Sequence, residues 1–421
     1  MSLKNKKTLI TFSRFQLSNG LRVIVHQDDS TPMAAVNVLY NVGARDEAPE
    51  KTGFAHLFEH LMFSGSANVP DFDEPIQKAG GENNAFTNND VTNFYNTVPV
   101  ENLETVFWLE SDRMHSLNIN QKSLEVQQKV VVEEFKETCL NQPYGDAWHH
   151  LSGLAYKVHP YRWPTIGVIP KHVANATLED VTDFYNKFYR PNNAILVVAG
   201  NVTVEGIKSL TEKWFGDIPA GNTPPRQLPV EPPQQQRQEK LVNSVVPMDA
   251  LYLGFHSPGR MQDDYYVADI LSDILCNGNS SRLHLRLHKE ERIFNQIDAF
   301  VTGNIDPGLL VIQGRPAEGI DLKTAEAAVW KELELLKNEK VTETELQKYK
   351  NKVESALIFS ETNILNKAIN LAYFELVGDA NIINMEVEHY QEITVEDIQR
   401  VANQIFTQEN CSGLFYKMTD K

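Results

Sequence analysis

The sequence predicts an α+β protein built from two related domains, each with a mixed or antiparallel sheet and helices packed on it. One observation is the alternation of short strand patterns with long helical patterns over 421 residues, which is too many for one ordinary core. The other is a weak internal repeat at an offset of about 216 residues. The matched segments are Thr177–Val181 with Thr394–Ile398, Pro32-Met33 with Pro247-Met248, and Leu61–Ser66 with Leu275–Ser280.

The elements of the first half follow one another in a clear order. β-Branched runs predict strands at 21–26, 34–42 and 193–202. Helical patterns predict helices at 54–63, 101–116, 121–139 and 178–189. Hairpin-length connections between these runs favour an α+β layer over a doubly wound parallel sheet.

A segment rich in proline and glutamine separates the two halves. Residues 218–239 contain Pro219, Pro224, Pro225, Pro229, Pro232 and Pro233. This composition is typical of a stiff, extended linker. We therefore expect one domain at 1–217 and its repeat at 240–421.

Charge and composition exclude several classes of partner. The net charge of −17 argues against nucleic acid and anionic membranes, which need basic patches, and favours cationic peptides. Cys139, Cys276 and Cys411 lie far apart without C-x-x-C spacing, so we expect a reducing, cytoplasmic location. Residues 1–7 contain no apolar signal core, although a signal peptide already removed would imply the periplasm instead.

One five-residue motif carries most of the chemistry. His56-Leu57-Phe58-Glu59-His60 reads H-x-x-E-H on a predicted helix. Helical spacing projects both imidazoles from one face with Glu59 beside them. Two neutral imidazoles can bind Zn²⁺, and the carboxylate can accept a proton from water. The alternative, two solvated histidines on a helix surface, is weakened by the apolar neighbours, which predict a buried helix.

At this point the chain resembles the pitrilysin-like zinc peptidases with the inverted motif. This family includes the mitochondrial processing peptidase, the insulin-degrading enzyme and small bacterial relatives of two domains. The segments that carry the resemblance, besides the motif, are Gly80–Thr87, Tyr161–Gly167 and Arg190–Ala194. The resemblance covers nearly the whole chain and implies the same fold of two related α+β domains.

The resemblance also implies the third metal ligand. A catalytic zinc takes three protein ligands, and in the family the third is a glutamate some seventy residues past the motif, after an apolar run. That position is Glu134, with 73 residues between it and His60, and Glu137 is the competing choice. The family often has a second glutamate seven residues earlier that helps hold water. Here that auxiliary position is Gln127, which can hydrogen-bond but carries no charge.

The second half lacks the histidine pair and is expected to do something else. In the family it often carries an arginine and a tyrosine that hold substrate carbonyls. Arg282 matches the arginine, with a surface salt bridge as its alternative role, but Asn295 stands at the tyrosine position. We therefore expect a dimer, and favour a heterodimer with a sister subunit that supplies both residues over a homodimer.

Together these features predict a zinc endopeptidase with one Zn²⁺ per chain, which cleaves peptides or unfolded segments. His56, His60 and Glu134 bind the metal and Glu59 is the base. The alternative is a non-proteolytic binding or assembly subunit of the same fold. The strand that includes Asn84, Ala85, Phe86 and Thr87 resembles the family segment that pairs with substrate, so it would bind peptides through main-chain hydrogen bonds. Phe86 would face a substrate side chain or lie in the core.

Overall fold

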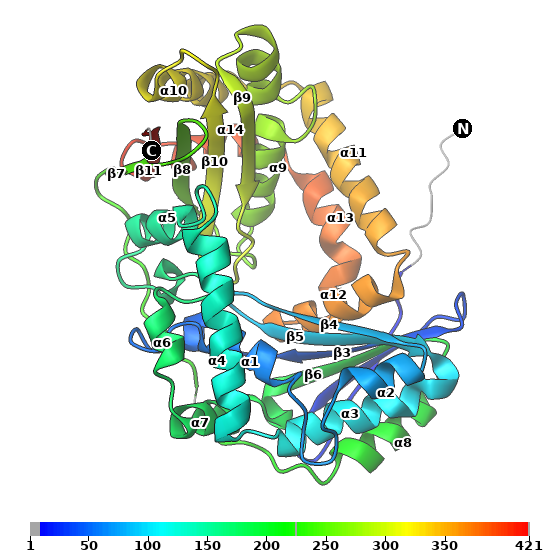
Figure 1. The fold of residues 1–421 in the computed structure, drawn as a ribbon. Helices are drawn as coiled ribbons and strands as arrows, with labels where there is room; N and C mark the ends of the chain where they lie inside the picture. Colours follow the sequence, from blue (N-terminus) through cyan, green and yellow to red (C-terminus); the bar gives the residue numbers. More distant parts are fainter. Residues whose placement is uncertain (1–8, 224, 420–421) are drawn as a thin grey trace, which may run out of the picture. The chain divides into compact units, whose positions relative to one another are not determined.

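The computed structural model describes residues 9–223 and 225–419 (Figure 1). The chain divides into two compact units. The first contains residues up to Val132, Thr165–Gln227 and Leu357–Glu386, and the second contains Glu133–Pro164, Leu228–Ala356 and the residues from Val387 onward. Three of the five divisions fall inside continuous helices, which are α4 (Gln121–Phe135), α11 (Glu343–Ser360) and α13 (Ile382–Glu392), and the other two follow Pro164 and Gln227.

The first unit is built on a six-stranded mixed sheet in its described part. Its order is β1 (Ser13–Gln16), β2 (Arg22–Gln27), β6 (Ala194–Gly200), β3 (Met33–Tyr40), β5 (Thr92–Pro99) and β4 (Glu82–Thr87). Strands β2 and β6 are parallel, and the other neighbours are antiparallel. The sheet confirms the predicted α+β class and the three strands predicted from β-branched runs.

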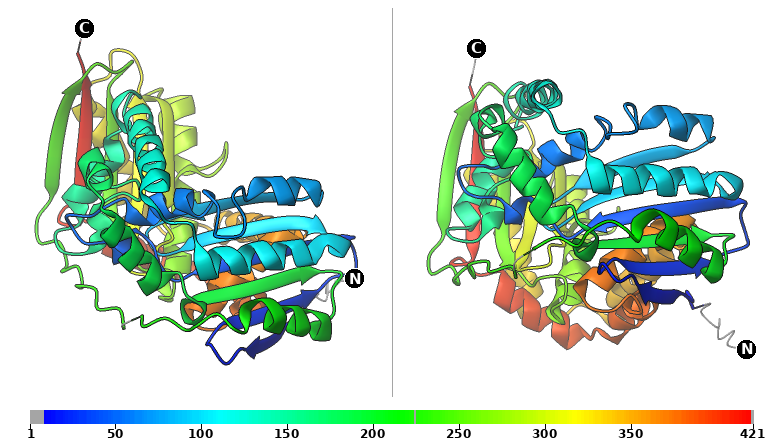
Figure 2. Two further views of the ribbon diagram at one scale, coloured as in Figure 1. Left: turned by 60° about the horizontal axis from the view of Figure 1, so that its bottom comes forward. Right: turned by 90° about the horizontal axis from the view of Figure 1, so that it is seen from below.

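Helices cover both faces of this sheet, as Figures 1 and 2 show. Strand β3 alternates between the two faces, with Val36 and Val38 on one and Ala35 and Leu39 on the other. The first face packs against α1 (Phe54–Leu61), α2 (Asp73–Lys78), α3 (Leu103–Ser116), α6 (Pro170–Ala174), α7 (Leu178–Phe188), α8 (Val204–Phe215) and the buried side of α4. The second face packs against α12 (Ile364–Val377), which comes from the second half of the chain.

The second unit repeats the arrangement with five described strands. Its order is β7 (Gln238–Ser244), β11 (Cys411–Met418), β8 (Ala250–Ser257), β10 (Gly308–Pro316) and β9 (Phe294–Val301). Strands β7 and β11 are parallel and the other described neighbours are antiparallel, just as β2 and β6 are the parallel pair of the first sheet. Helix α5 (Ala147–Ala155), from the first half, packs on one face, while α9 (Asp264–Cys276), α10 (Leu322–Asn338) and α14 (Val395–Ile405) pack together elsewhere on this unit.

The matching strand orders support the predicted duplication. The repeated Thr177 and Thr394 each begin a helix, α7 and α14, with the same capping box, in which Asp180 and Asp397 complete the pair. The expected linker at 218–239 separates the two sheets along the chain, although β7 already begins at Gln238 within it. However, each half gives one helix to the opposite unit, α5 in one direction and α12 in the other, so the compact units do not follow chain order.

The predicted helices are found with small shifts at their ends. The helix expected at 101–116 begins as α3 at Leu103 after a short 3-10 turn, and that expected at 121–139 is α4 followed by the π-helical segment Lys136–Leu140. The linker has no regular secondary structure before β7, and Pro224 lies outside the described residues, as do residues 1–7. No helix in the described part of the chain is both long and apolar enough to cross a membrane.

Candidate metal centre

The motif lies on α1, a short helix with one buried face. Phe54, Leu57, Phe58 and Leu61 are buried in the core against the sheet. Helical periodicity then leaves His56, Glu59 and His60 half-buried on the remaining face. The imidazole ring centroids of the two histidines are 4.8 Å apart.

A buried carboxylate that was not predicted from the sequence holds the start of α1. The N-cap residue Gly53 has φ +88° and no side chain with which to cap the helix. Glu47 replaces that cap, because its carboxylate accepts hydrogen bonds from the backbone N–H of Gly53 at 2.9 Å and of Ala55 at 2.8 Å. Burial raises the pKa of Glu47 well above its usual value, although these hydrogen bonds oppose the effect. An acidic residue shortly before a helix that starts at glycine was the available signal.

The segment Thr165–Gly167, part of the family-like stretch, also supports the start of α1. The hydroxyl of Thr52 accepts from the Val168 N–H at 2.9 Å and is 2.8 Å from His172 Nδ1. Gly53 lies so close to this segment that a Cβ there would be 2.8 Å from the Ile166 carbonyl oxygen. The start of α1 is therefore fixed by packing as well as by the carboxylate.

Helix α4 carries Glu134, the third side chain of the candidate metal site. One ligand atom each of His56, His60 and Glu134 lie within 4.8 Å of one another, and this is the one such group of three among the described residues. Glu134 is half-buried, whereas Glu133 is exposed and paired with Lys136 at 2.6 Å. Glu137 is exposed in the π-helical segment and does not belong to the group. The geometry therefore favours Glu134 over Glu137.

The chemistry of this group fits zinc. Two imidazole nitrogens and a carboxylate oxygen are the ligand set of many catalytic zinc sites. Ligand atoms on a tetrahedral ion with bonds of about 2.1 Å lie roughly 3.4 Å apart, so small side-chain rotations would close this group around an ion. Glu59 lies on the same helix, one residue before His60.

Gln127 lies two turns before Glu134 on α4 and connects that helix to the end of α1. Its side-chain amide donates to the Ser64 hydroxyl at 2.9 Å, and that hydroxyl donates to the His60 carbonyl at 3.3 Å. A glutamate could not donate this hydrogen bond. Gln127 therefore serves to hold α4 against α1.

The expected substrate strand is an edge strand. β4 is last in its sheet and pairs, among the described strands, with β5 alone. Asn84 is exposed, and Ala85 and Thr87 are half-buried. The ring of Phe86 packs against the cluster that contains α12, whereas Ala85 packs on the α1 side of the sheet. Phe86 thus lies on the face opposite the metal-binding helix.

Arg282 and Asn295 are the second-half residues at the positions of the family's arginine and tyrosine. Arg282 donates two hydrogen bonds to the Glu345 carboxylate, at 2.9 and 2.8 Å, and these raise the pKa of the guanidinium. The pair is largely buried, with 15 % and 20 % of the side chains exposed. Asn295 is exposed on β9. The geometry gives Arg282 the salt-bridge role.

Two duplicated α+β units, together with the group of His56 and His60 on α1 and Glu134 on α4, define the class of protein, and comparison with known families agrees. Residues 22–167 match the family described as insulinase (peptidase family M16), and residues 175–353 match the peptidase M16 inactive domain. The chain belongs to peptidase family M16.

Relatives of known name extend over most of the chain. The zinc protease PqqE of Helicobacter pylori is 28% identical over 409 residues, which cover 95% of this chain and 91% of that protein. The β subunit of the mitochondrial-processing peptidase of Saccharomyces cerevisiae is 24% identical over 363 residues, 82% of this chain and 78% of that protein. The crystal structure of a protease from Helicobacter pylori, 28% identical, superposes with a TM-score of 0.92 and covers 97% of this chain and 100% of that one.

Proposed function

We propose that this protein is a zinc-dependent endopeptidase that cleaves peptides or unfolded segments. The observation that carries the proposal is the convergence of His56, His60 and Glu134, with Glu59 on the same helix as the histidines. The names of its relatives, zinc protease among them, support the proposal.

Each residue has a defined part in this chemistry. Zinc, when bound by the three ligands, supplies Lewis-acid polarisation of a carbonyl and a lowered water pKa. Glu59 accepts a proton from the attacking water and can pass it to the leaving amine. Glu47 and Gln127 orient the helices that carry these groups, and the partly buried setting of α1 limits bulk water around them.

The free edge of β4 supports a peptide substrate. An extended peptide would add as a further strand, and main-chain hydrogen bonds would give affinity with little dependence on sequence. The excess of carboxylates in the chain, with a net charge of −17, favours cationic peptides.

The test is cleavage of a fluorogenic unstructured cationic peptide by the purified chain, together with its zinc content. We expect turnover that stops on chelation, returns when zinc is restored, and is absent from Glu59→Gln with its zinc intact. A chain that holds zinc but gives no turnover, alone or with any partner, would favour the non-proteolytic assembly role.

We also propose that the active form includes a second chain, as a heterodimer with a sister subunit. The support is that Arg282, the expected donor to substrate, already donates to Glu345, and that Asn295 is shorter than the family tyrosine. Oxyanion stabilisation needs a donor aimed at the developing charge, and the partner would supply it. Co-purification from the native source tests this. Full turnover by the chain alone, unchanged by any partner, would contradict it.

A further inference from the structure

The turn that follows β4 is a closed, well-bonded structure. Residues 88–91 connect β4 to β5, and the Asn88 side-chain oxygen accepts from the backbone N–H of Asp90 at 2.7 Å and of Val91 at 2.9 Å. Asn88 N–H also donates to the Val91 carbonyl at 3.0 Å. Whatever holds β4 in place therefore also holds this turn.

A second loop, Gly43–Glu47, lies directly on that turn, and we call it the capping loop because it presents Glu47. Two backbone hydrogen bonds join the loop to the turn, from Ala44 N–H to the Asn88 carbonyl at 3.1 Å and from Arg45 N–H to the Asn89 carbonyl at 2.9 Å. The approach is close, since a Cβ at Gly43 would lie 2.5 Å from the Asn89 carbonyl.

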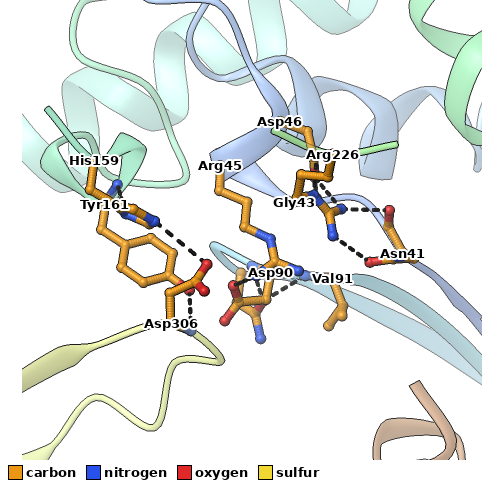
Figure 3. A network of polar contacts seen from close by, with 11 residues as sticks. Asn41, Gly43, Arg45, Asp46, Asp90, Val91, His159, Tyr161, Arg226 and Asp306 are labelled. Atoms are coloured by element: carbon orange, nitrogen blue, oxygen red, sulfur yellow. Dashed lines mark hydrogen bonds and ion pairs between the residues drawn. The ribbon is translucent and has the colours of Figure 1, made fainter. Parts of the chain in front are cut away.

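A buried ion pair reinforces the same junction (Figure 3). Arg45 and Asp90 form a salt bridge at 2.8 Å, with 4% and 5% of their side chains exposed. Because both side chains are buried, separating them would leave an uncompensated charge in the protein interior. The ion pair therefore strongly favours contact between the capping loop and the turn.

The capping loop is also held from its other side. Arg226 of the linker donates to the two carboxylate oxygens of Asp46, at 2.7 and 2.9 Å, and to the Asn41 carbonyl at 3.0 Å (Figure 3). Asp46 in turn accepts from the Gly43 N–H at 3.0 Å. The loop is thus fixed at both ends, and Glu47 follows at once with its two hydrogen bonds to the start of α1.

We propose that the capping loop is a positioning link that couples the β4 edge to the metal-binding helix, with Glu47 and the Arg45–Asp90 pair as its positioning residues. A peptide bound along β4 further stabilises the strand that leads into the 88–91 turn, the turn holds the capping loop, and Glu47 then holds the start of α1 three residues before His56. Peptide binding therefore tightens the hold on zinc, and zinc tightens peptide binding by the same factor. The inference rests on the proposed function, since it needs both a peptide on β4 and zinc on α1.

Zinc retention tests Glu47 without any need for turnover. Zinc-loaded protein is mixed with a chromogenic chelator, and the rate of zinc release is measured. Glu47→Gln keeps the shape but turns a donor amide toward one of the two N–H groups, so release should be about 10-fold faster, the range for residues that orient metal ligands. The matched control is Glu50→Gln, which makes the same substitution at an exposed position three residues on and should leave the rate unchanged.

The coupling is tested in the Glu59→Gln background, so that the peptide stays intact. A fluorescein-labelled unstructured cationic peptide should slow zinc release by about 5-fold or more, the lower end of typical coupling between sites. The double change Arg45→Gln with Asp90→Asn removes the ionic link without leaving a buried charge, so the fold should survive. In that variant the peptide should slow release by less than about 2-fold, because only the two backbone hydrogen bonds between loop and turn and direct shielding of the metal remain. Asp29→Asn, an exposed aspartate, is the control and should behave like the parent.

The outcomes separate the inference from the function on which it rests. Zinc content and peptide anisotropy are recorded for every variant. If the parent binds zinc and peptide but the peptide slows release equally in the parent and the double variant, the coupling is wrong and the proposed function stands. If the parent binds no zinc or no peptide, both are wrong. If Glu47→Gln releases zinc at the parent rate with a native circular dichroism spectrum, Glu47 is not a positioning residue.

Discussion

Helices α1 and α9 occupy equivalent positions in the two halves, yet their polar faces have different uses. Each follows the central strand of its sheet, β3 or β8. On α9, Asp264 accepts two hydrogen bonds from Arg400, and Asp269 accepts one from Tyr390 at 2.7 Å. On α1, the polar side chains meet Glu134 instead, and the helix is capped from outside by Glu47.

The difference teaches how one scaffold can carry a site in one copy and not in the other. The carboxylates of Asp264 and Asp269 on α9 form hydrogen bonds within their own unit. These contacts stabilise the packing of α9 against α13 and α14. The first helix is shorter, with eight residues against thirteen, and its own polar groups form a metal-binding set. Substitutions at matched positions in the two halves can therefore separate chemistry from stability.

The largest expected effect is on catalysis, through α1. Glu59→Gln should reduce peptide cleavage by about 10²–10⁴-fold, because glutamine cannot accept the proton from water. Zinc content should stay at the wild-type level, measured by atomic absorption. Asp273→Asn on α9 is the matched change and should leave turnover normal. Activity of Glu59→Gln within tenfold of wild type would remove Glu59 as the base.

The second effect is on metal binding, through α4. Glu134→Gln should lose most of its zinc on dialysis, because one of three ligands is weakened. Glu137→Gln should keep its zinc, since this exposed side chain lies outside the group. Metal analysis of the two dialysed proteins decides between them, and full occupancy in Glu134→Gln would point to Glu137.

The third effect is on stability, in the second half. Glu345→Ala should lower the free energy of unfolding by about 3 kcal/mol, because it leaves Arg282 charged and largely buried. Lys340→Ala breaks the exposed pair with Glu396 and should leave the free energy of unfolding close to that of wild type. Urea unfolding measures both. If Glu345→Ala is as stable as wild type and cleaves peptides faster, Arg282 acts on substrate and the salt-bridge role is wrong.

The smallest effects should be equal in the two halves. Thr177→Ala and Thr394→Ala each remove the same capping box and should each cost about 1 kcal/mol of unfolding free energy. Serine keeps the hydroxyl, so Thr177→Ser and Thr394→Ser should be close to wild type. A loss confined to one of the alanine variants would show that the two caps are not equivalent in energy.

Much of the fold and part of the site could be predicted from the chain because they depend on local periodicity. β-Branched runs predicted β2, β3 and β6, helical spacing predicted α1, α3, α4 and α7, and the repeat predicted two similar domains. The spacing of His56, Glu59 and His60 placed them on one helical face without knowledge of the rest of the molecule. Glu134 was identified through family resemblance, since no local rule links residues so far apart.

Sequence by itself determined the motif and predicted the linker, both of which are readable within short windows, and it predicted the duplication from short matches that share one offset. Tertiary structure alone decided that α5 and α12 are exchanged between units, that Glu47 caps α1, and that Arg282 forms a salt bridge with Glu345. The physical reason is that a buried charge or a bare helix end must find a partner, and many residues of the right type are available along the chain. Which of them is near enough depends on how distant segments pack, and periodicity carries no information about that.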